Sequence, residues 1–393
     1  MKYNGIVFAD LHIGAMDLEK LHEEYEEMLI KEIKKMKSLD FLIIAGDFFD
    51  HKFYLNDKES SMAYYMLNEL IEVCKEKETV IRIVYGTESH ECNQYDILSL
   101  LKIYDKIKVI KEVNEEELLP GMNVLYLPEE HIIDKEEYYE TFFNNTKKYD
   151  YIFGHGVLRE VMSDVAKHID TSSKNKRKKV PVFSTAELNK ICKGQVFFGH
   201  YHINQNINDK FFSIGSFSRW KFGEESVKGY YKLKCNPYKK TYEATHIENT
   251  LADTFNTIAF GYENDMFKSD DDLNNALERI DNMISNDTFD HVRFVFNIPS
   301  TVDNPEATMN LLKEKYKFND KVKLEIQHGY IEEKKERQKE EIQKENEKYS
   351  FIFDKSLPLE DKISRFIAIE YNKNIPTDSV KKYLSSGLNE ILE

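Results

Sequence analysis

The sequence has few cysteines, no long apolar run and a deficit of positive charge, and each absence excludes a class of protein. The four cysteines are scattered, without a CxxC pair, so neither a disulfide framework nor a thiolate zinc site is expected. No stretch approaches the ~18 apolar residues of a membrane-spanning helix, which predicts a cytoplasmic protein without membrane contact. With 55 Lys+Arg against 70 Asp+Glu, the net charge of −15 argues against coating nucleic acid through bulk charge.

What is present is material for two or three domains with packed cores. The chain has 393 residues, of which 41% are hydrophobic and 13% aromatic, and this content argues against intrinsic disorder. Apolar residues at helical spacing from Leu18 to Met36, after Asp17 as N-cap, predict a helix. Short apolar runs over residues 1–247 predict strands at 5–9, 41–45, 80–85, 123–127, 151–153, 195–198, 211–214 and 230–233. The sequence therefore predicts an α/β fold, with sheet strands covered by helices.

Three shorter segments follow this first domain. Residues 250–330 combine an alternating strand pattern with an apolar helical stripe, which predicts a small α+β domain. Residues 331–349 are rich in Glu and Lys at i,i+4 spacing and predict a solvated helical linker. Residues 350–393 predict a hairpin of two amphipathic helices. A hairpin of this size cannot bury both apolar faces by itself, so we expect it to dock on a partner.

Five clusters of polar residues each follow a predicted strand. They are Asp10-Leu11-His12, the run from Gly46 to Asp50, Ser89-His90-Glu91, Gly154-His155-Gly156, and the run from Gly199 to His202. Ligands gather at the carboxyl ends of strands in layered α/β proteins. One cluster alone is weak evidence, since an isolated GDxxD is usually a turn with a capping aspartate. Carboxylates mixed with imidazoles suit Mn²⁺, Fe²⁺ or Zn²⁺ better than Mg²⁺ or Ca²⁺ alone.

Taken in order, the five clusters resemble the calcineurin-like metallophosphoesterase signature, D-x-H, GD-x-x-D, GNH(D/E), GH and GH-x-H. The resemblance implies a layered β-sandwich with helices outside and a site for two divalent metals, Mn²⁺ first and Mg²⁺ as the alternative. It assigns one metal to Asp10, His12, Asp47 and His202, and the other to Asp47, His155, His200 and the residue at Ser89. Two such ions about 3.5–4 Å apart clamp a phosphate and activate a water that attacks phosphorus.

The same resemblance gives His90 and Asp50 catalytic roles. His90 would protonate the leaving oxygen or stabilise its charge, and Asp50, three residues after the bridging Asp47, would hold the His90 imidazole. The alternative for Asp50 is a simple loop cap.

The third cluster departs from the family pattern. Two residues are inserted between Gly86 and His90, and Ser89 stands where asparagine is expected. A serine hydroxyl is a poorer ligand than an amide oxygen, so the second metal is expected to bind weakly or through water. Glu88 is an alternative ligand, and a degenerate site is a further alternative.

The sequence downstream of the clusters is similar to the SbcD nuclease family. The matching runs are Ser213 to Trp220, Phe222 to Glu225, and Lys228 to Tyr230. This resemblance implies a homodimeric nuclease subunit that pairs with an SbcC-type, SMC-like ATPase in double-strand-break repair. Its activities would be 3′ to 5′ digestion of double-stranded DNA and endonucleolytic cleavage of single strands. In this reading, residues 1–247 form the nuclease domain, 250–330 a capping domain that binds DNA, and 350–393 the ATPase-binding hairpin. The Lys-, Asn- and Tyr-rich composition suggests a bacteriophage protein acting in the host cytoplasm.

Two alternatives share the five clusters: a small-molecule phosphodiesterase or phosphatase, and a non-catalytic scaffold for the ATPase. A basic run between the fourth and fifth clusters fits a loop that follows DNA phosphates, although a solvated surface loop explains it equally well. The run consists of Lys174, Lys176, Arg177, Lys178 and Lys179.

Overall fold

The structure is a computed structural model. It describes residues 2–54, 57–96, 98, 104–144, 147–161, 179–260, 270–286, 290–298, 310, 313–317, 321–328, 357–371, 376–382 and 384. The chain divides into two compact units, one of residues 1–257 with 287–293 and the other of residues 258–286 with 294–393. Over the described residues, no helix is long and apolar enough to cross a membrane. The domain boundaries drawn from the sequence stay predictions.

The first unit contains two six-stranded sheets. The strands of the first sheet, in spatial order, are β14 (Thr241–Glu248), β13 (Gly229–Asn236), β1 (Tyr3–Phe8), β2 (Phe41–Ala45), β3 (Val80–Val84) and β4 (Ile107–Ile110). Strands β1 to β4 run parallel, and β13 and β14 add an antiparallel edge.

The second sheet is also parallel at its centre. Its strands, in spatial order, are β11 (Gln205–Asn206), β12 (Phe211–Ser213), β10 (Cys192–Gly199), β7 (Tyr149–His155), β6 (Met122–Leu127) and β5 (Asn114–Leu119). Strands β12, β10, β7 and β6 are parallel, whereas β11 and β5 are antiparallel edges.

Alternating side chains place each sheet between two apolar layers. In β2, Ile43 packs in a core shared with Phe153 and Phe197 of the second sheet, while Leu42 and Ile44 face the opposite way. This is the two-residue period of a strand that is buried on both faces. The two sheets therefore face each other across one core and use their outer faces for helices.

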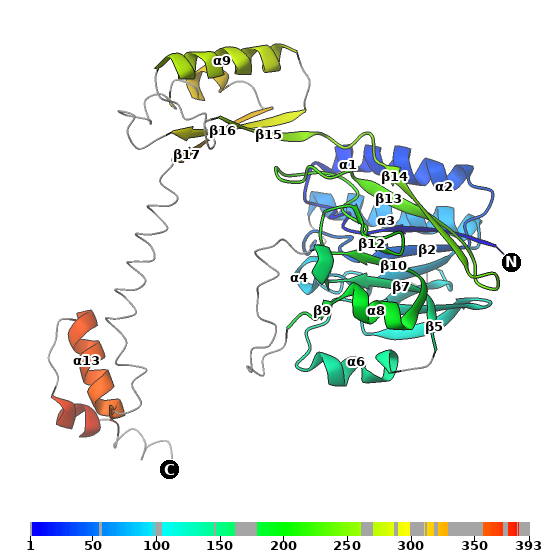
Figure 1. Ribbon diagram of the computed structural model, residues 1–393, viewed down its shortest axis with the longest axis horizontal. Coiled ribbons are helices and arrows are strands. Elements are labelled where there is room, and N and C mark those ends of the chain that lie inside the picture. Colours follow the sequence, from blue (N-terminus) through cyan, green and yellow to red (C-terminus); the bar gives the residue numbers. More distant parts are fainter. Residues whose placement is uncertain are drawn as a thin grey trace. The chain divides into compact units, whose positions relative to one another are not determined.

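Helices cover both outer faces (Figure 1). The first sheet is covered by α1 (Leu18–Tyr25), the π turn η1 (Glu26–Ile30), α2 (Lys31–Lys35) and α3 (Lys58–Glu76). The second sheet is covered by α6 (Lys135–Phe143) and α8 (Thr185–Ile191). The predicted N-cap is confirmed, because the Asp17 carboxylate accepts a hydrogen bond from the Lys20 backbone N–H at 2.9 Å. The predicted α/β class is confirmed as well.

The second unit holds most of a three-stranded sheet in the order β15 (Phe255–Phe260), β16 (His291–Ile298) and β17 (Val322–His328). It also contains α9 (Asp270–Ser285) and α13 (Leu359–Tyr371), and residues 377–382 are helical. Within residues 250–330, the structure has both the strand and the helix that the sequence predicts there, as β16 and α9. The predicted charged linker at 331–349 lies outside the described residues.

Candidate metal centre

The predicted clusters lie on loops that bond to one another at the ends of central strands. Asp10 lies two residues after the end of β1, and its N–H donates to the Gly46 carbonyl at 3.1 Å. The His12 N–H donates to the Asp47 carbonyl at 3.0 Å. The His200 N–H, after β10, donates to the Asp10 carboxylate at 3.0 Å. These bonds join loops of both sheets, as the strand-end argument requires.

The backbone of this region is strained at the residues that carry the polar side chains. Asp10, His12 and Asp47 have φ of 50°, 47° and 48°, and His200 has φ of 97°. Non-glycine residues rarely adopt positive φ, and such strain concentrates at functional sites. Gly86 is required beside them, because a Cβ there would lie 2.2 Å from Asp47 Oδ1. The loops are thus shaped around the carboxylate of Asp47.

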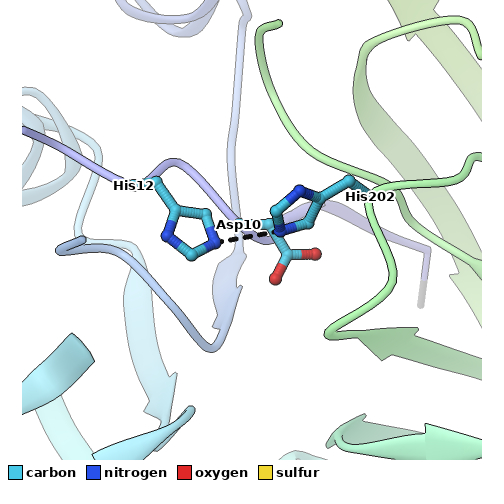
Figure 2. A group of neighbouring side chains, drawn as sticks. All are labelled: Asp10, His12 and His202. Atoms are coloured by element: carbon cyan, nitrogen blue, oxygen red, sulfur yellow. Dashed lines mark hydrogen bonds between the residues drawn. The ribbon is translucent and has the colours of Figure 1, made fainter. Parts of the chain in front are cut away.

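Asp10, His12 and His202 form the first group of potential ligands, shown in Figure 2. Their ligand atoms all lie within 4.8 Å of one another, and the Nε2 atoms of the two histidines are 3.1 Å apart. The Nδ1–H of His12 donates to Asp50 Oδ1 at 3.2 Å, and that of His202 donates to Glu224 Oε1 at 2.6 Å. Each Nε2 then presents a lone pair to the other, an arrangement that a cation between them would stabilise.

His155 forms the second group with Asp10 and Asp47. Its Nδ1–H donates to the Ala45 carbonyl at 2.8 Å, which leaves Nε2 facing Asp47 Oδ2 at 3.2 Å. This Nε2 is buried and has no hydrogen bond of good geometry. Burial alone would lower the pKa of His155, but Asp47, Asp10 and Glu129 raise it to about 10. The fully buried imidazole therefore sits where positive charge is strongly favoured, as at a cation site.

Glu129 forms the third group with His155 and His200. Its Oε2 lies 3.0 Å from His200 Nδ1 and 3.8 Å from His155 Nε2, and its side chain is 3% exposed. Burial would raise the pKa of Glu129, but the hydrogen bond from His200 and the charge of His155 lower it. Glu129 lies outside the five clusters predicted from the sequence. It nevertheless follows the predicted strand 123–127 by two residues, a position at which strand-end ligands are expected.

The structure places Asp50 and His90 together but with different partners from those expected. The Asp50 carboxylate contacts His12, and this hydrogen bond is the main reason that the pKa of Asp50 is lowered. His90 Nδ1 instead bonds to the backbone carbonyl of Asp50. The ligand atoms of His12, Asp50 and His90 nevertheless all lie within 4.8 Å of one another.

Ser89 and Glu88 lie in the single-turn helix α4 (Glu88–Glu91), and both are exposed. Glu88 belongs to none of the metal-ligand groups found among the described residues. Thr87 takes the inner position instead: its N–H donates to Asp47 Oδ1 at 2.7 Å, and its Oγ1 lies 3.2 Å from Asp47 Oδ2. The Thr87 hydroxyl is also 3.2 Å from Glu129 Oε2.

Most of the basic run, namely Lys174, Lys176, Arg177 and Lys178, lies outside the described residues. Lys179 is described, and it forms a β-bridge with Ile132. Its proposed contact with DNA stays a prediction.

Two buried charged residues, Glu224 and Lys228, form hydrogen bonds with His202. Glu224 accepts from His202 Nδ1–H, and the fully buried Lys228 ammonium donates to the His202 carbonyl at 2.8 Å and to Ser216 Oγ at 2.7 Å. Burial lowers the pKa of Lys228 to about 8, although Glu224 counteracts it. These contacts fix which ring nitrogen of His202 faces the centre. They also give a structural role to the Phe222–Glu225 and Lys228–Tyr230 runs.

Comparisons with known proteins add no family assignment. No protein-family model matches this chain, and no curated protein matches it. The function is therefore inferred from the geometry of the candidate centre.

A buried carboxyl beside the centre gives a prediction of pH dependence. Glu91 is fully buried, and its Oε1 accepts from the Tyr95 hydroxyl at 3.2 Å. Burial, and then the charge of Asp47, raise the pKa of Glu91 from 4.5 to about 8. The folded protein therefore holds a proton that the unfolded chain releases above its own pKa. The stabilisation is complete below the unfolded value and is lost as the pH rises toward the folded value.

We expect the free energy of unfolding of the metal-free protein to fall between pH 6 and pH 8, by on the order of 2 kcal/mol from this group. The Glu91→Gln variant, an isostere of the protonated acid, should lack this part of the decrease. Urea denaturation in EDTA at both pH values measures it, with Glu88→Gln as a control at an exposed position. Equal pH dependence in the wild type and Glu91→Gln would contradict the assignment.

Proposed function

We propose that the protein is a two-metal phosphodiesterase that cleaves DNA. The observation that carries the proposal is the meeting of the buried carboxylates of Asp10, Asp47 and Glu129 with His155 Nε2, which is buried and has no hydrogen-bond partner. The first ion would be held by Asp10, His12, Asp47 and His202. The second would be held by Asp47, His155 and His200. Asp47 suits the bridging role because its Oδ2 lies 3.7 Å from His12 Nε2 and 3.2 Å from His155 Nε2.

Bound divalent cations would supply Lewis acidity toward a phosphate and a water of lowered pKa. The residues of the chain have separate tasks around them. Asp50 and Glu224 orient His12 and His202 through their Nδ1 atoms. His90, half-buried and engaged through Nδ1, keeps Nε2 for donating a proton to the leaving oxygen.

Three features support a nuclease within the metallophosphoesterase class. Two facing sheets with helices on their outer faces support the layered sandwich that the resemblance implies. A cavity of about 380 Å³, lined by Tyr85, Lys111, Glu129 and Tyr138 among others, gives room for a substrate group beside the centre. In the second unit, α13 exposes Leu359 and Phe366, in keeping with a hairpin that docks on an ATPase partner.

The test is a cleavage assay on end-labelled double- and single-stranded DNA with Mn²⁺, Mg²⁺ or EDTA, with and without an SbcC-type ATPase. We expect cleavage that needs the metal, with Mn²⁺ more active than Mg²⁺. A chromogenic phosphodiester is assayed in parallel. Hydrolysis of this ester without DNA cleavage would replace the proposal by a small-molecule phosphodiesterase. Hydrolysis of neither substrate would indicate a non-catalytic scaffold.

A further inference from the structure

We infer that Glu129 is a ligand of the second metal and stands in for the asparagine of the family signature, an inference that rests on the proposed two-metal site. The residue lies on the loop that follows β6, outside all five sequence clusters. Its Oε2 is directed at His200 Nδ1 and lies within 4.8 Å of the ligand atoms of both His155 and His200. The Glu129 carboxylate thus takes the ligand position for which the sequence predicted Ser89 or Glu88.

A second observation points to a ligand at this place. His155 Nε2 is fully buried, lacks a well-formed hydrogen bond and lies between Asp47 Oδ2 and Glu129 Oε2, at 3.2 and 3.8 Å. Two carboxylates and an imidazole nitrogen around one enclosed point form a donor set for a divalent cation. Without a cation, the negative charges of Asp47 and Glu129 repel each other in a buried site.

The Glu129 carboxylate is held in place by the residue next to Gly86. Thr87 Oγ1 lies 3.2 Å from Glu129 Oε2 and 3.2 Å from Asp47 Oδ2, so it spans the two carboxylates, and its N–H fixes Asp47 Oδ1. Thr87 directly follows Gly86, where the family signature has its asparagine. The threonine side chain is too short to replace that amide alone. Thr87 therefore positions the Glu129 carboxylate, and Glu129 supplies the ligand oxygen that the asparagine amide would have supplied.

The replacement changes the charge of the second site. An asparagine amide is neutral, whereas Glu129 adds a negative charge beside Asp47 and Asp10. A site with more carboxylate oxygen favours harder cations such as Mn²⁺ and Mg²⁺. We therefore expect tight binding at the second site, in contrast to the weak binding expected from a serine ligand.

The test is Mn²⁺ binding to the full chain, measured by calorimetry and by the emission of Trp220. This residue is the single tryptophan of the chain, and its ring centroid lies 4.9 Å from that of His12 and 4.8 Å from that of His202. Its emission therefore reports on the first site, while calorimetry counts both. We expect two Mn²⁺ ions in the wild type. In Glu129→Gln, the second affinity should fall by at least about 10-fold, with the Trp220 response to the first ion retained.

Matched variants distinguish the three oxygen donors. Glu88→Gln and Ser89→Ala should bind both ions as the wild type does. Glu129→Asp should bind the second ion with intermediate affinity, and thermal unfolding in EDTA checks that each variant folds. Loss of the second ion in Glu88→Gln or Ser89→Ala, or wild-type binding by Glu129→Gln, would overturn the inference.

The inference and the proposed function fail in different ways. If the second ion depends on Glu129 but the wild type cleaves no phosphodiester, then the ligand assignment stands and the enzyme proposal falls. If the wild type cleaves DNA and Glu129→Gln still binds two ions, then the enzyme proposal stands and the ligand assignment falls.

Discussion

Asp47→Asn should remove the bridging ligand and lower metal-dependent phosphodiester cleavage by about 10³-fold or more, because a two-ion clamp contributes several kcal/mol to the transition state. Asp47 faces both His12 and His155, so an amide in its place weakens both metal sites at once. Asparagine tolerates the φ of 48° at this position. The variant should therefore fold. Calorimetry with Mn²⁺ and the initial rate on labelled DNA measure the two effects.

Asp209→Asn is the matched control for this substitution. Asp209 is exposed, lies in the turn between β11 and β12, and has φ of 59°, so the same chemical change is made in a similar backbone conformation. Its metal binding and cleavage rate should equal those of the wild type. Full activity in Asp47→Asn would show that the centre is not catalytic.

His90→Ala should lower DNA cleavage roughly 10²-fold or more while leaving both metals bound, in keeping with loss of a general acid. The backbone carbonyl of Asp50 occupies Nδ1 of His90, and no metal ligand is removed by the change. Metal content by calorimetry and single-turnover cleavage rates are the measurements. His22, which is half-buried on α1 and pairs with Glu69, provides the control variant His22→Ala.

Substrates with different leaving groups distinguish a general acid from a structural residue at position 90. A nitrophenolate departs without a proton, so His90→Ala should affect a nitrophenyl phosphodiester much less than DNA. An equal loss on both substrates, or a loss of metal, would assign His90 to binding of the metals or of the phosphate.

The sequence was most informative where one strand leads directly into a polar cluster. The strand predicted at 41–45 coincides with β2, and clusters far apart in the chain meet because the central strands of each sheet run parallel. Residues that follow parallel strands lie at the same edge of the sheet, where the carboxyl ends of the strands meet. The general position of the centre therefore followed from local pattern.

The oxygen ligand proposed for the second metal site could not be predicted from the local sequence pattern. The two-residue insertion is absorbed by the single turn of α4, which keeps Thr87 at Asp47 and His90 at Asp50 while turning Glu88 and Ser89 to the surface. Glu129 reaches the centre from the other sheet, and sequence spacing does not encode the distance between loops of different sheets. The contact of the Asp50 carboxylate with His12 joins two loops of the first sheet, and the motif does not encode how closely those loops approach.

The candidate ligands are divided between the two sheets, and this division matters for how the unit holds together. Asp10, His12 and Asp47 follow strands of the first sheet, whereas Glu129, His155, His200 and His202 belong to strand ends of the second. An ion bound by ligands from both sheets would cross-link the two sheets reversibly. A ligand present at 100 times its dissociation constant adds about 2.7 kcal/mol to the folded state. Separation of the sheets would then require release of the ions, so metal supply would set the cooperativity of unfolding as well as the chemistry.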